Sequence, residues 1–280
     1  MSELRTWVTD LGLVESPRWH DGRLYFSDWT AHEVIALGAD GAHEVVARVD
    51  SLPLCSAFGP DGRLVIVDAA RGLLLRLEAD GSLVTHADLT GLARGWNDIV
   101  IDGRGNIYVD RVGFDMLAGE AFALGSVVHV APDGSARQVA DGIAFPNGMA
   151  VTQDNSTLIV ADSYGNKLMG YDIEADGGLS NGRVWADLGD GAPDGICVDA
   201  EDAVWYADVP NRRCVRVREG GEIVQTIGLD RGAFACELGG DDRSTLFITA
   251  AEWRGMPEMV PPGTGRVLSA QVAVPGAGWP

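Results

Sequence analysis

Three oxygen-bearing side chains lie in closely related sequence contexts, and together they could bind a metal ion. Glu15 lies in VESPRW, Asn147 in FPNGMAV and Asp194 in APDGICV. Two carboxylates and one amide oxygen suit hard divalent cations such as Ca²⁺, Mg²⁺ or Mn²⁺. Each residue taken alone has a simpler explanation, because Asn147-Gly148 and Asp194-Gly195 are common turn dipeptides and Glu15 could be a surface acid. Their shared context favours the metal site.

A fourth polar residue, Asn97, occupies a similar place in the segment RGWNDIV. An uncharged amide beside a cation site can hydrogen-bond a substrate or a water molecule, although a role in a turn is the alternative. Arg94 lies three residues earlier, where it could contact a substrate oxygen or remain solvated. Asp98 could cap the start of a strand. We therefore expect Asn97 and Arg94 to contribute to substrate binding.

The elements that would position these residues repeat along the chain. An apolar strand, a turn of the Asp-Gly or Asp-Asn kind and a second apolar strand occur six times, with starts separated by 41, 41, 50, 47 and 43 residues. A period in this range is typical of a β-propeller with one four-stranded antiparallel blade per repeat. We expect residues 1–280 to form one all-β, six-bladed propeller domain. The repeats begin near Glu15, Ser56, Asn97, Asn147, Asp194 and Glu237.

Sixfold closure would bring equivalent positions of the repeats together around one axis, so Glu15, Asn97, Asn147 and Asp194 should converge there. Closure also requires a strand from the N-terminus, because the last repeat supplies too few strands. The segment Leu4–Val8 has no partner in the first repeat. Its pairing with the last blade near residues 267–272 would remove a free sheet edge.

Aspartate ends the second strand of five repeats and should cap the turn that follows through its side chain. These residues are Asp28, Asp68, Asp110, Asp162 and Asp208.

The repeat is interrupted most strongly at residues 111–125, RVGFDMLAGEAFALG. A loop that is longer than its neighbours on a rigid scaffold is a common place for substrate contacts. We expect this loop to cover the channel mouth and to set substrate size, with Phe114 and Met116 as apolar walls.

Composition and charge exclude some classes of partner. The formal net charge of −20 disfavours binding to nucleic acid and to anionic membranes. Acidic turns that keep the protein soluble are the simplest explanation of this charge. No apolar run approaches a membrane span, and no secretory signal is visible in MSELRTWVTD. We therefore expect a cytoplasmic protein, a monomer or weak homodimer, with reduced thiols at Cys55, Cys197, Cys214 and Cys236.

Two nucleotide-binding motifs are absent from the sequence. It contains no Walker motif and no G-x-G-x-x-G segment. The five histidines fall in expected turns and outer strands, so none is well placed as a general base.

Five segments, in order, carry a family resemblance: VESPRWHDGRLYFSDW, WNDIVIDGRGNIYV, FPNGMAVTQDNSTLIVADS, APDGICVDAEDAVWYAD and CELGGDDRSTLFITAAE. Through them the chain resembles the senescence marker protein (regucalcin), gluconolactonase and luciferin-regenerating enzyme family over essentially its whole length. The resemblance implies a six-bladed propeller with one catalytic divalent cation in its central channel. It places the family's metal ligands at Glu15, Asn147 and Asp194, and its substrate-contacting asparagine at Asn97.

The function that the resemblance implies is hydrolysis of a small, sugar-type lactone. The expected cation is calcium, with zinc, manganese, magnesium or iron as alternatives; it would polarise the lactone carbonyl and acidify a water molecule. We expect Asp194 to be the general base and Asn97 to stabilise the oxyanion. Two other functions remain open: a metal-dependent phosphotriesterase similar to diisopropylfluorophosphatase, and a non-enzymatic calcium-binding propeller scaffold.

The sequence departs from the vertebrate members of this family at two places. They carry an arginine two residues before the substrate asparagine, where this chain has Gly95. The segment 111–125 also differs from the vertebrate lid.

Overall fold

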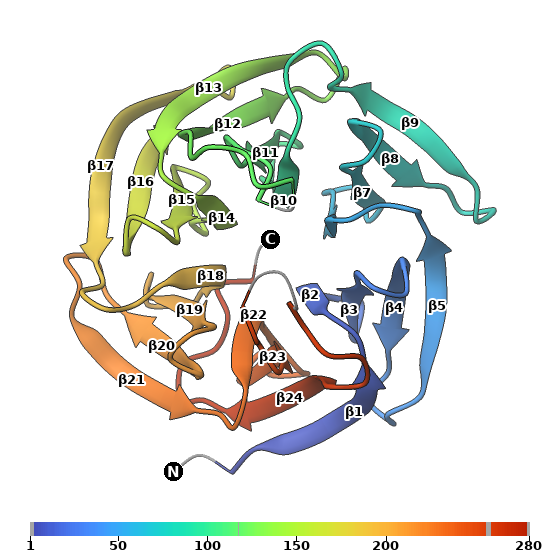
Figure 1. Ribbon diagram of the computed structural model, residues 1–280, viewed down its shortest axis with the longest axis vertical. Helices are drawn as coiled ribbons and strands as arrows, with labels where there is room; N and C mark the ends of the chain where they lie inside the picture. Colours follow the sequence, from blue (N-terminus) through green and yellow to red (C-terminus); the bar gives the residue numbers. More distant parts are fainter. Residues whose placement is uncertain (1–2, 117, 256–258, 279–280) are drawn as a thin grey trace.

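The computed structural model describes residues 3–116, 118–255 and 259–278. Its strands form six four-stranded antiparallel sheets, which surround a central axis as the blades of a six-bladed β-propeller (Figure 1). The predicted fold class is therefore confirmed. Within the described residues, no helix is long and apolar enough to cross a membrane.

Each blade runs from an inner strand beside the axis to an outer strand at the rim (Figure 1). The first blade contains β2 (Val14–His20), β3 (Arg23–Asp28), β4 (Glu33–Leu37) and β5 (His43–Arg48). The second contains β6 (Leu54–Phe58), β7 (Leu64–Asp68), β8 (Leu73–Leu77) and β9 (Leu83–Asp88). The third contains β10 (Trp96–Ile101), β11 (Ile107–Arg111), β12 (Gly125–Val130) and β13 (Ala136–Ile143).

The remaining blades follow the same order. The fourth contains β14 (Pro146–Val151), β15 (Thr157–Asp162), β16 (Lys167–Ile173) and β17 (Leu179–Asp187). The fifth contains β18 (Pro193–Val198), β19 (Val204–Asp208), β20 (Arg213–Val217) and β21 (Ile223–Gly228). The sixth contains β22 (Gly232–Gly239), β23 (Thr245–Ala251) and β24 (Gly265–Gln271), with β1 (Arg5–Leu11) as its outer strand.

The N-terminal strand closes the ring, as the sequence predicts. β1 pairs antiparallel with β24, with Arg5 opposite Ser269 and Leu11 opposite Gly265. The indole N–H of Trp7 donates a 2.9 Å hydrogen bond to the Ser269 hydroxyl. β1 continues beyond the predicted end of the segment, so the first and last parts of the chain share one sheet. This pairing covers the edge that β24 would otherwise expose.

Apolar side chains pack between neighbouring blades. Because successive residues of a strand face opposite sides of the sheet, each blade presents apolar side chains to both neighbours. Val65 and Val67 of the second blade, for example, share one buried cluster with Ile99 and Ile101 of the third. The four cysteines are buried free thiols, as expected.

The repeated aspartates cap their turns in four blades. Asp28 accepts hydrogen bonds from the backbone N–H groups of Thr30 and Ala31, both at 3.1 Å. In the second, fourth and fifth blades the equivalent aspartate binds the residue three positions later. These are Asp68, Asp162 and Asp208.

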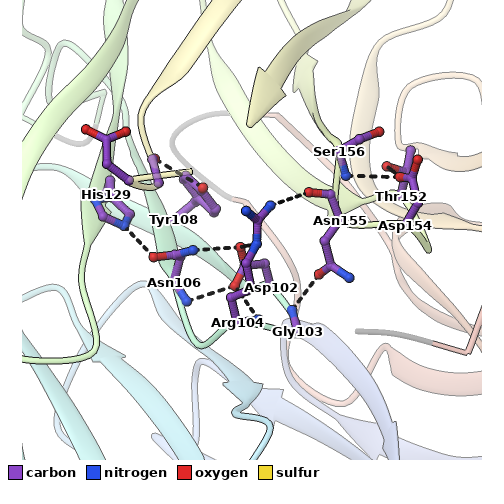
Figure 2. A network of polar contacts seen from close by, with 12 residues as sticks. Asp102, Gly103, Arg104, Asn106, Tyr108, His129, Thr152, Asp154, Asn155 and Ser156 are labelled. Carbon is purple, nitrogen blue, oxygen red and sulfur yellow. Dashed lines mark hydrogen bonds and ion pairs between the residues drawn. The ribbon is translucent and has the colours of Figure 1, made fainter. Parts of the chain in front are cut away.

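Polar contacts join neighbouring blades at the end of the ring where each inner strand turns into the next strand (Figure 2). The backbone N–H of Gly103 donates to the Asn155 side chain, and the Arg104 guanidinium donates to the Asn155 carbonyl, both at 2.6 Å. Asp102 accepts hydrogen bonds from the backbone and side chain of Asn106, both at 2.8 Å. The network fixes the β10–β11 turn against the β14–β15 turn, far along the strands from the channel mouth.

The sixth repeat begins earlier than the sequence predicts. β22 begins at Gly232, so Glu237 lies near the far end of the strand, opposite Phe247. The first residues of β22 carry neither a polar side chain nor a turn signal, and the pattern therefore did not mark its start. Glu237 instead lines a cavity of about 520 Å³ at the end of the channel bounded by the first turns of the blades.

Candidate metal and substrate site

The predicted metal ligands converge at the channel mouth, which is the end of the central channel where the inner strands begin. Glu15, Asn97, Asn147 and Asp194 each occupy the second position of an inner strand, in β2, β10, β14 and β18. The first three line one cavity of about 10 Å³, together with Gly195. A volume of this order accommodates one water-sized species.

Asn147 is held by a chain of hydrogen bonds that crosses two blades. Asp162 accepts a 2.9 Å hydrogen bond from the backbone N–H of Phe145, two residues before Asn147. The Asn147 amide donates to the Ser163 hydroxyl at 3.3 Å, and that hydroxyl donates to the Pro193 carbonyl at 2.6 Å. Because Pro193 directly precedes Asp194, Ser163 couples the positions of two proposed ligands.

The strands that carry Glu15 and Asp194 are anchored in the same way, by an aspartate that accepts a backbone N–H just before the strand. Asp28 accepts a 2.8 Å hydrogen bond from the N–H of Gly12, just before the strand that carries Glu15. Asp208 accepts a 3.4 Å hydrogen bond from the N–H of Ala192, just before β18. The repeated aspartates therefore cap turns and also orient the entry to the inner strands.

Asp98 and Arg18 also line this cavity, a placement that sequence reasoning missed. The Arg18 guanidinium donates to the Asp98 carboxylate at 3.2 Å, and the backbone N–H of Met149 donates to it at 3.1 Å. The backbone N–H of Asp98 donates to the Asp110 carboxylate. Asp98 thus connects the first, third and fourth blades rather than capping a strand. Asp110, the repeated aspartate of the third blade, accepts the hydrogen bond from the Asp98 backbone. The one feature of the sequence that could have indicated a place in the site is that Asp98 directly follows Asn97.

Burial and mutual repulsion dominate the electrostatics of the site. Burial, followed by the charges of Asp194 and Asp98, raises the pKa of Glu15 well above its usual range, and the charge of Arg18 does not outweigh them. Burial and the charge of Asp98 raise the pKa of Asp194 to about 8, although a hydrogen bond from Asn147 opposes the shift. A divalent cation would relieve this repulsion, and the oxygen donors present fit such an ion.

The donor set differs from a site built from ionisable residues alone. Across residues 3–116, 118–255 and 259–278, no group of three or more His, Cys, Asp or Glu side chains is placed to hold a metal ion. The proposed set contains two carboxylates, Glu15 and Asp194, and its third donor is the amide oxygen of Asn147. An amide oxygen is an accepted ligand for Ca²⁺.

Arg94 is not brought into the cavity. Its side chain is exposed, and it takes part in none of the side-chain hydrogen bonds or ion pairs found for the described residues. The neighbouring Gly95 has a φ of 87°, and a Cβ there would lie 2.6 Å from the Val112 carbonyl oxygen. An arginine at position 95 would therefore strain the backbone.

Phe114 lies beside the segment of the fourth blade that carries Asn147. Its ring centroid is 6.1 Å from that of Phe145 and 6.3 Å from that of Tyr164. The loop between β11 and β12 thus reaches the channel mouth, in agreement with its expected position (Figure 1). Met116 contacts the same group, because the Tyr164 hydroxyl donates to its sulfur at 3.4 Å. The sequence did not indicate that Phe145 and Tyr164 lie at the channel mouth, because the loops that carry them are no longer than the equivalent loops of other blades.

A six-bladed propeller with an oxygen-lined axial cavity defines the structural class. Residues 13–252 match the model of the SMP-30/Gluconolactonase/LRE-like region. The chain therefore belongs to this family.

Curated relatives and solved structures extend this comparison. Pentonolactonase XacC from Haloferax volcanii is 25% identical over 267 residues, which cover 90% of this chain and 86% of the relative. Regucalcin from Danio rerio is 29% identical over 246 residues, covering 85% and 82%. The structure of a luciferin-regenerating enzyme superposes with a TM-score of 0.83 at 20% identity, covering 99% of this chain and 97% of that one. This last likeness concerns the fold alone.

Proposed function

We propose that this protein is a metal-dependent hydrolase that opens a small lactone, with Glu15, Asn147 and Asp194 as ligands of one divalent cation. The observation that supports this most strongly is the convergence of one buried carboxylate, Glu15, one half-buried carboxylate, Asp194, and the amide oxygen of Asn147 at the channel mouth. Calcium is the proposed cation because every donor is an oxygen, and zinc, manganese, magnesium or iron would compete for the same donors. The name of the pentonolactonase relative supports a lactone as substrate.

The residues around the cavity suggest a division of roles. A bound cation would polarise the ester carbonyl and acidify water. Asp194 has two carboxylate oxygens, so one can serve as a ligand while the other accepts a proton from the attacking water. The Asn97 amide donates to the Asn147 oxygen at 3.3 Å and also hydrogen-bonds the Asp110 carboxylate, so it would exchange one of these partners for the substrate oxygen that gains negative charge.

Asp98 and Arg18 keep this arrangement in place. The Arg18 guanidinium forms an ion pair with Asp98, and Asp98 in turn accepts a hydrogen bond from the backbone of Met149, two residues beyond Asn147. These residues are positioning residues, because no reacting group is placed on them. Their rigidity would reduce the reorganisation required during the reaction.

The direct test is a panel of lactones and one phosphotriester, assayed with a chelator-treated protein and separately restored cations. We expect acid release from at least one lactone when a cation is restored, and loss of that release on renewed chelation. Faster turnover of the phosphotriester than of every lactone would instead assign a phosphotriesterase. Cation binding without turnover of any compound would contradict the hydrolase and favour a binding scaffold.

A further inference from the structure

One side of the channel mouth is bounded by four aromatic rings, here called the aromatic wall: Phe114, Phe122, Phe145 and Tyr164. Ring centroids lie 4.7 Å apart for Phe145 and Tyr164, and 5.5 Å apart for Phe114 and Phe122. The rings pack on one another, yet Phe122 remains 56% exposed and Tyr164 55% exposed. Two such exposed rings in one cluster are typical of a surface that contacts another molecule.

The aromatic wall stands directly beside the proposed metal ligands. Phe145 precedes Asn147 by two residues. Tyr164 follows Ser163, whose hydroxyl contacts the Asn147 amide at 3.3 Å. A side group of a molecule whose reacting carbonyl lies over the cavity can therefore reach these rings.

The sixth blade supplies an apolar surface on the opposite side of the mouth. The loops β11–β12 and β23–β24 belong to blades that face each other across the axis (Figure 1). Phe234 precedes Ala235, which lines the cavity, and packs edge to face with Trp253 at 6.0 Å. Met259 and Val260 pack against the same cluster. The mouth is thus apolar on two sides.

The polar groups of the β11–β12 loop are largely engaged within the loop. The Glu120 carboxylate accepts the backbone N–H of Asp115 at 2.9 Å, and the Asp115 carboxylate accepts that of Ala118 at 2.9 Å. The Tyr164 hydroxyl donates to Met116. A sugar lactone presents several hydroxyls that need partners, whereas these walls offer apolar contact.

We propose that the natural substrates are lactones carrying an alkyl or aromatic substituent, which binds between the aromatic wall and the Phe234–Trp253 surface. This inference rests on the proposed lactonase function. Apolar contact with the substituent, in place of recognition of sugar hydroxyls, is then the source of substrate specificity. Each methylene buried in the mouth should raise kcat/KM by about fourfold.

The kinetic test compares γ-butyrolactone, γ-hexalactone, γ-octalactone and gluconolactone with the same restored cation. We expect kcat/KM to rise with alkyl length and to exceed the value for gluconolactone. Phe122→Ser and Tyr164→Ser should abolish the rise, measured as the ratio of kcat/KM for each alkyl lactone to kcat/KM for γ-butyrolactone with the same variant. Tyr164→Phe should retain it, because the ring and not the hydroxyl makes the contact. Val184→Ser, at a 55% exposed position on β17, is the matched control and should retain it fully.

Two kinetic results would overturn the inference while leaving the lactonase proposal intact. One is faster turnover of gluconolactone than of every alkyl lactone. The other is an undiminished rise with alkyl length in both aromatic-wall variants.

A binding measurement tests the inference even if no lactone is turned over. The non-hydrolysable probes are 2-hexylcyclopentanone and cyclopentanone, followed by saturation-transfer NMR on the full chain. We expect the hexyl ketone to bind at least about tenfold more tightly, and Phe122→Ser and Tyr164→Ser to remove this advantage. Equal binding of the two ketones, or equal binding by wild type and both variants, would refute an apolar subsite. If no lactone is turned over but the hexyl ketone still binds more tightly, only the proposed lactonase function would be rejected.

Discussion

The side-chain amide of Asn97 donates a 3.3 Å hydrogen bond to the amide oxygen of Asn147, although the two residues lie 50 positions apart in the chain. The contact joins the third and fourth blades at the channel mouth. It links the residue proposed to bind substrate with a residue proposed to bind the cation. An amide oxygen has two lone pairs, so Asn147 can accept this hydrogen bond and still act as a ligand.

The roles of Asp194 and Asn97 can be separated by substitution. Asp194→Asn retains the shape and one oxygen but removes the charge and the proposed base. We expect weaker cation binding and activity close to background, even at saturating cation. Metal titration and steady-state kinetics on one lactone measure both effects. Recovery of near wild-type turnover at saturating cation would show that Asp194 is a ligand only.

Asn97→Ala should behave differently, because Asn97 is assigned to the substrate. Cation affinity should stay nearly unchanged, while kcat/KM falls by about 10²–10³, equivalent to roughly 2.7–4 kcal/mol for loss of one oxyanion donor. A large loss of cation affinity in this variant would contradict the assignment and place Asn97 among the ligands.

Glu237 should make stability depend on pH. Burial raises its pKa from 4.5 to about 8, with the charges of Arg18 and Arg243 opposing the shift. Between these values the folded protein keeps a proton that the unfolded chain releases, so this residue costs stability as pH rises. Between these pKa values the free energy of unfolding should fall by up to about 1.4 kcal/mol per pH unit because of Glu237, and Glu237→Gln should remove this fall.

Urea unfolding at about pH 5 and about pH 8 measures this effect. The free energy of unfolding of Glu237→Gln should increase relative to that of the wild type as pH rises, with the larger difference at about pH 8. A difference that does not change with pH would mean that the folded-state pKa of Glu237 is ordinary.

Deletion of residues 1–9 should lower the melting temperature by several degrees. It removes most of β1, including the Trp7 hydrogen bond to Ser269, and exposes the edge of β24. Differential scanning calorimetry provides the measurement. Deletion of residues 1–3, which precede β1, is the control and should leave the curve unchanged. Equal melting of both truncated proteins and the wild type would argue against closure by β1.

The repeat pattern predicted the fold because every blade carries its own turn signal and apolar alternation. It predicted the convergence of Glu15, Asn97, Asn147 and Asp194 because equivalent positions in a closed ring must meet at the axis. The contribution of the N-terminal strand followed from the need to pair the last blade. These features depend on local pattern and symmetry, which a sequence displays directly.

Other features depend on packing between distant segments. The Arg18–Asp98 pair joins residues far apart in sequence, and neither residue has a distinctive local context. Tyr164 lies in a turn like those of other blades, but the long β11–β12 loop of the neighbouring blade packs against it. The start of β22 was missed because its first residues carry no polar marker. A single sequence does not directly show which distant segments will pack against each other.

The central claim is that Glu15, Asn147 and Asp194 hold one divalent cation, and calorimetric titration of the chelator-treated full chain tests it most directly. We predict one Ca²⁺ site per chain in the wild type. Glu15→Gln, Asn147→Ala and Asp194→Asn should each weaken it by more than the roughly 10–100-fold typical of losing a residue that only supports a ligand. Glu237→Gln, a buried carboxyl in the other cavity, should bind as the wild type does. Unchanged affinity in the three ligand variants, or no site for any of calcium, magnesium, manganese, zinc or iron in the wild type, would contradict the account.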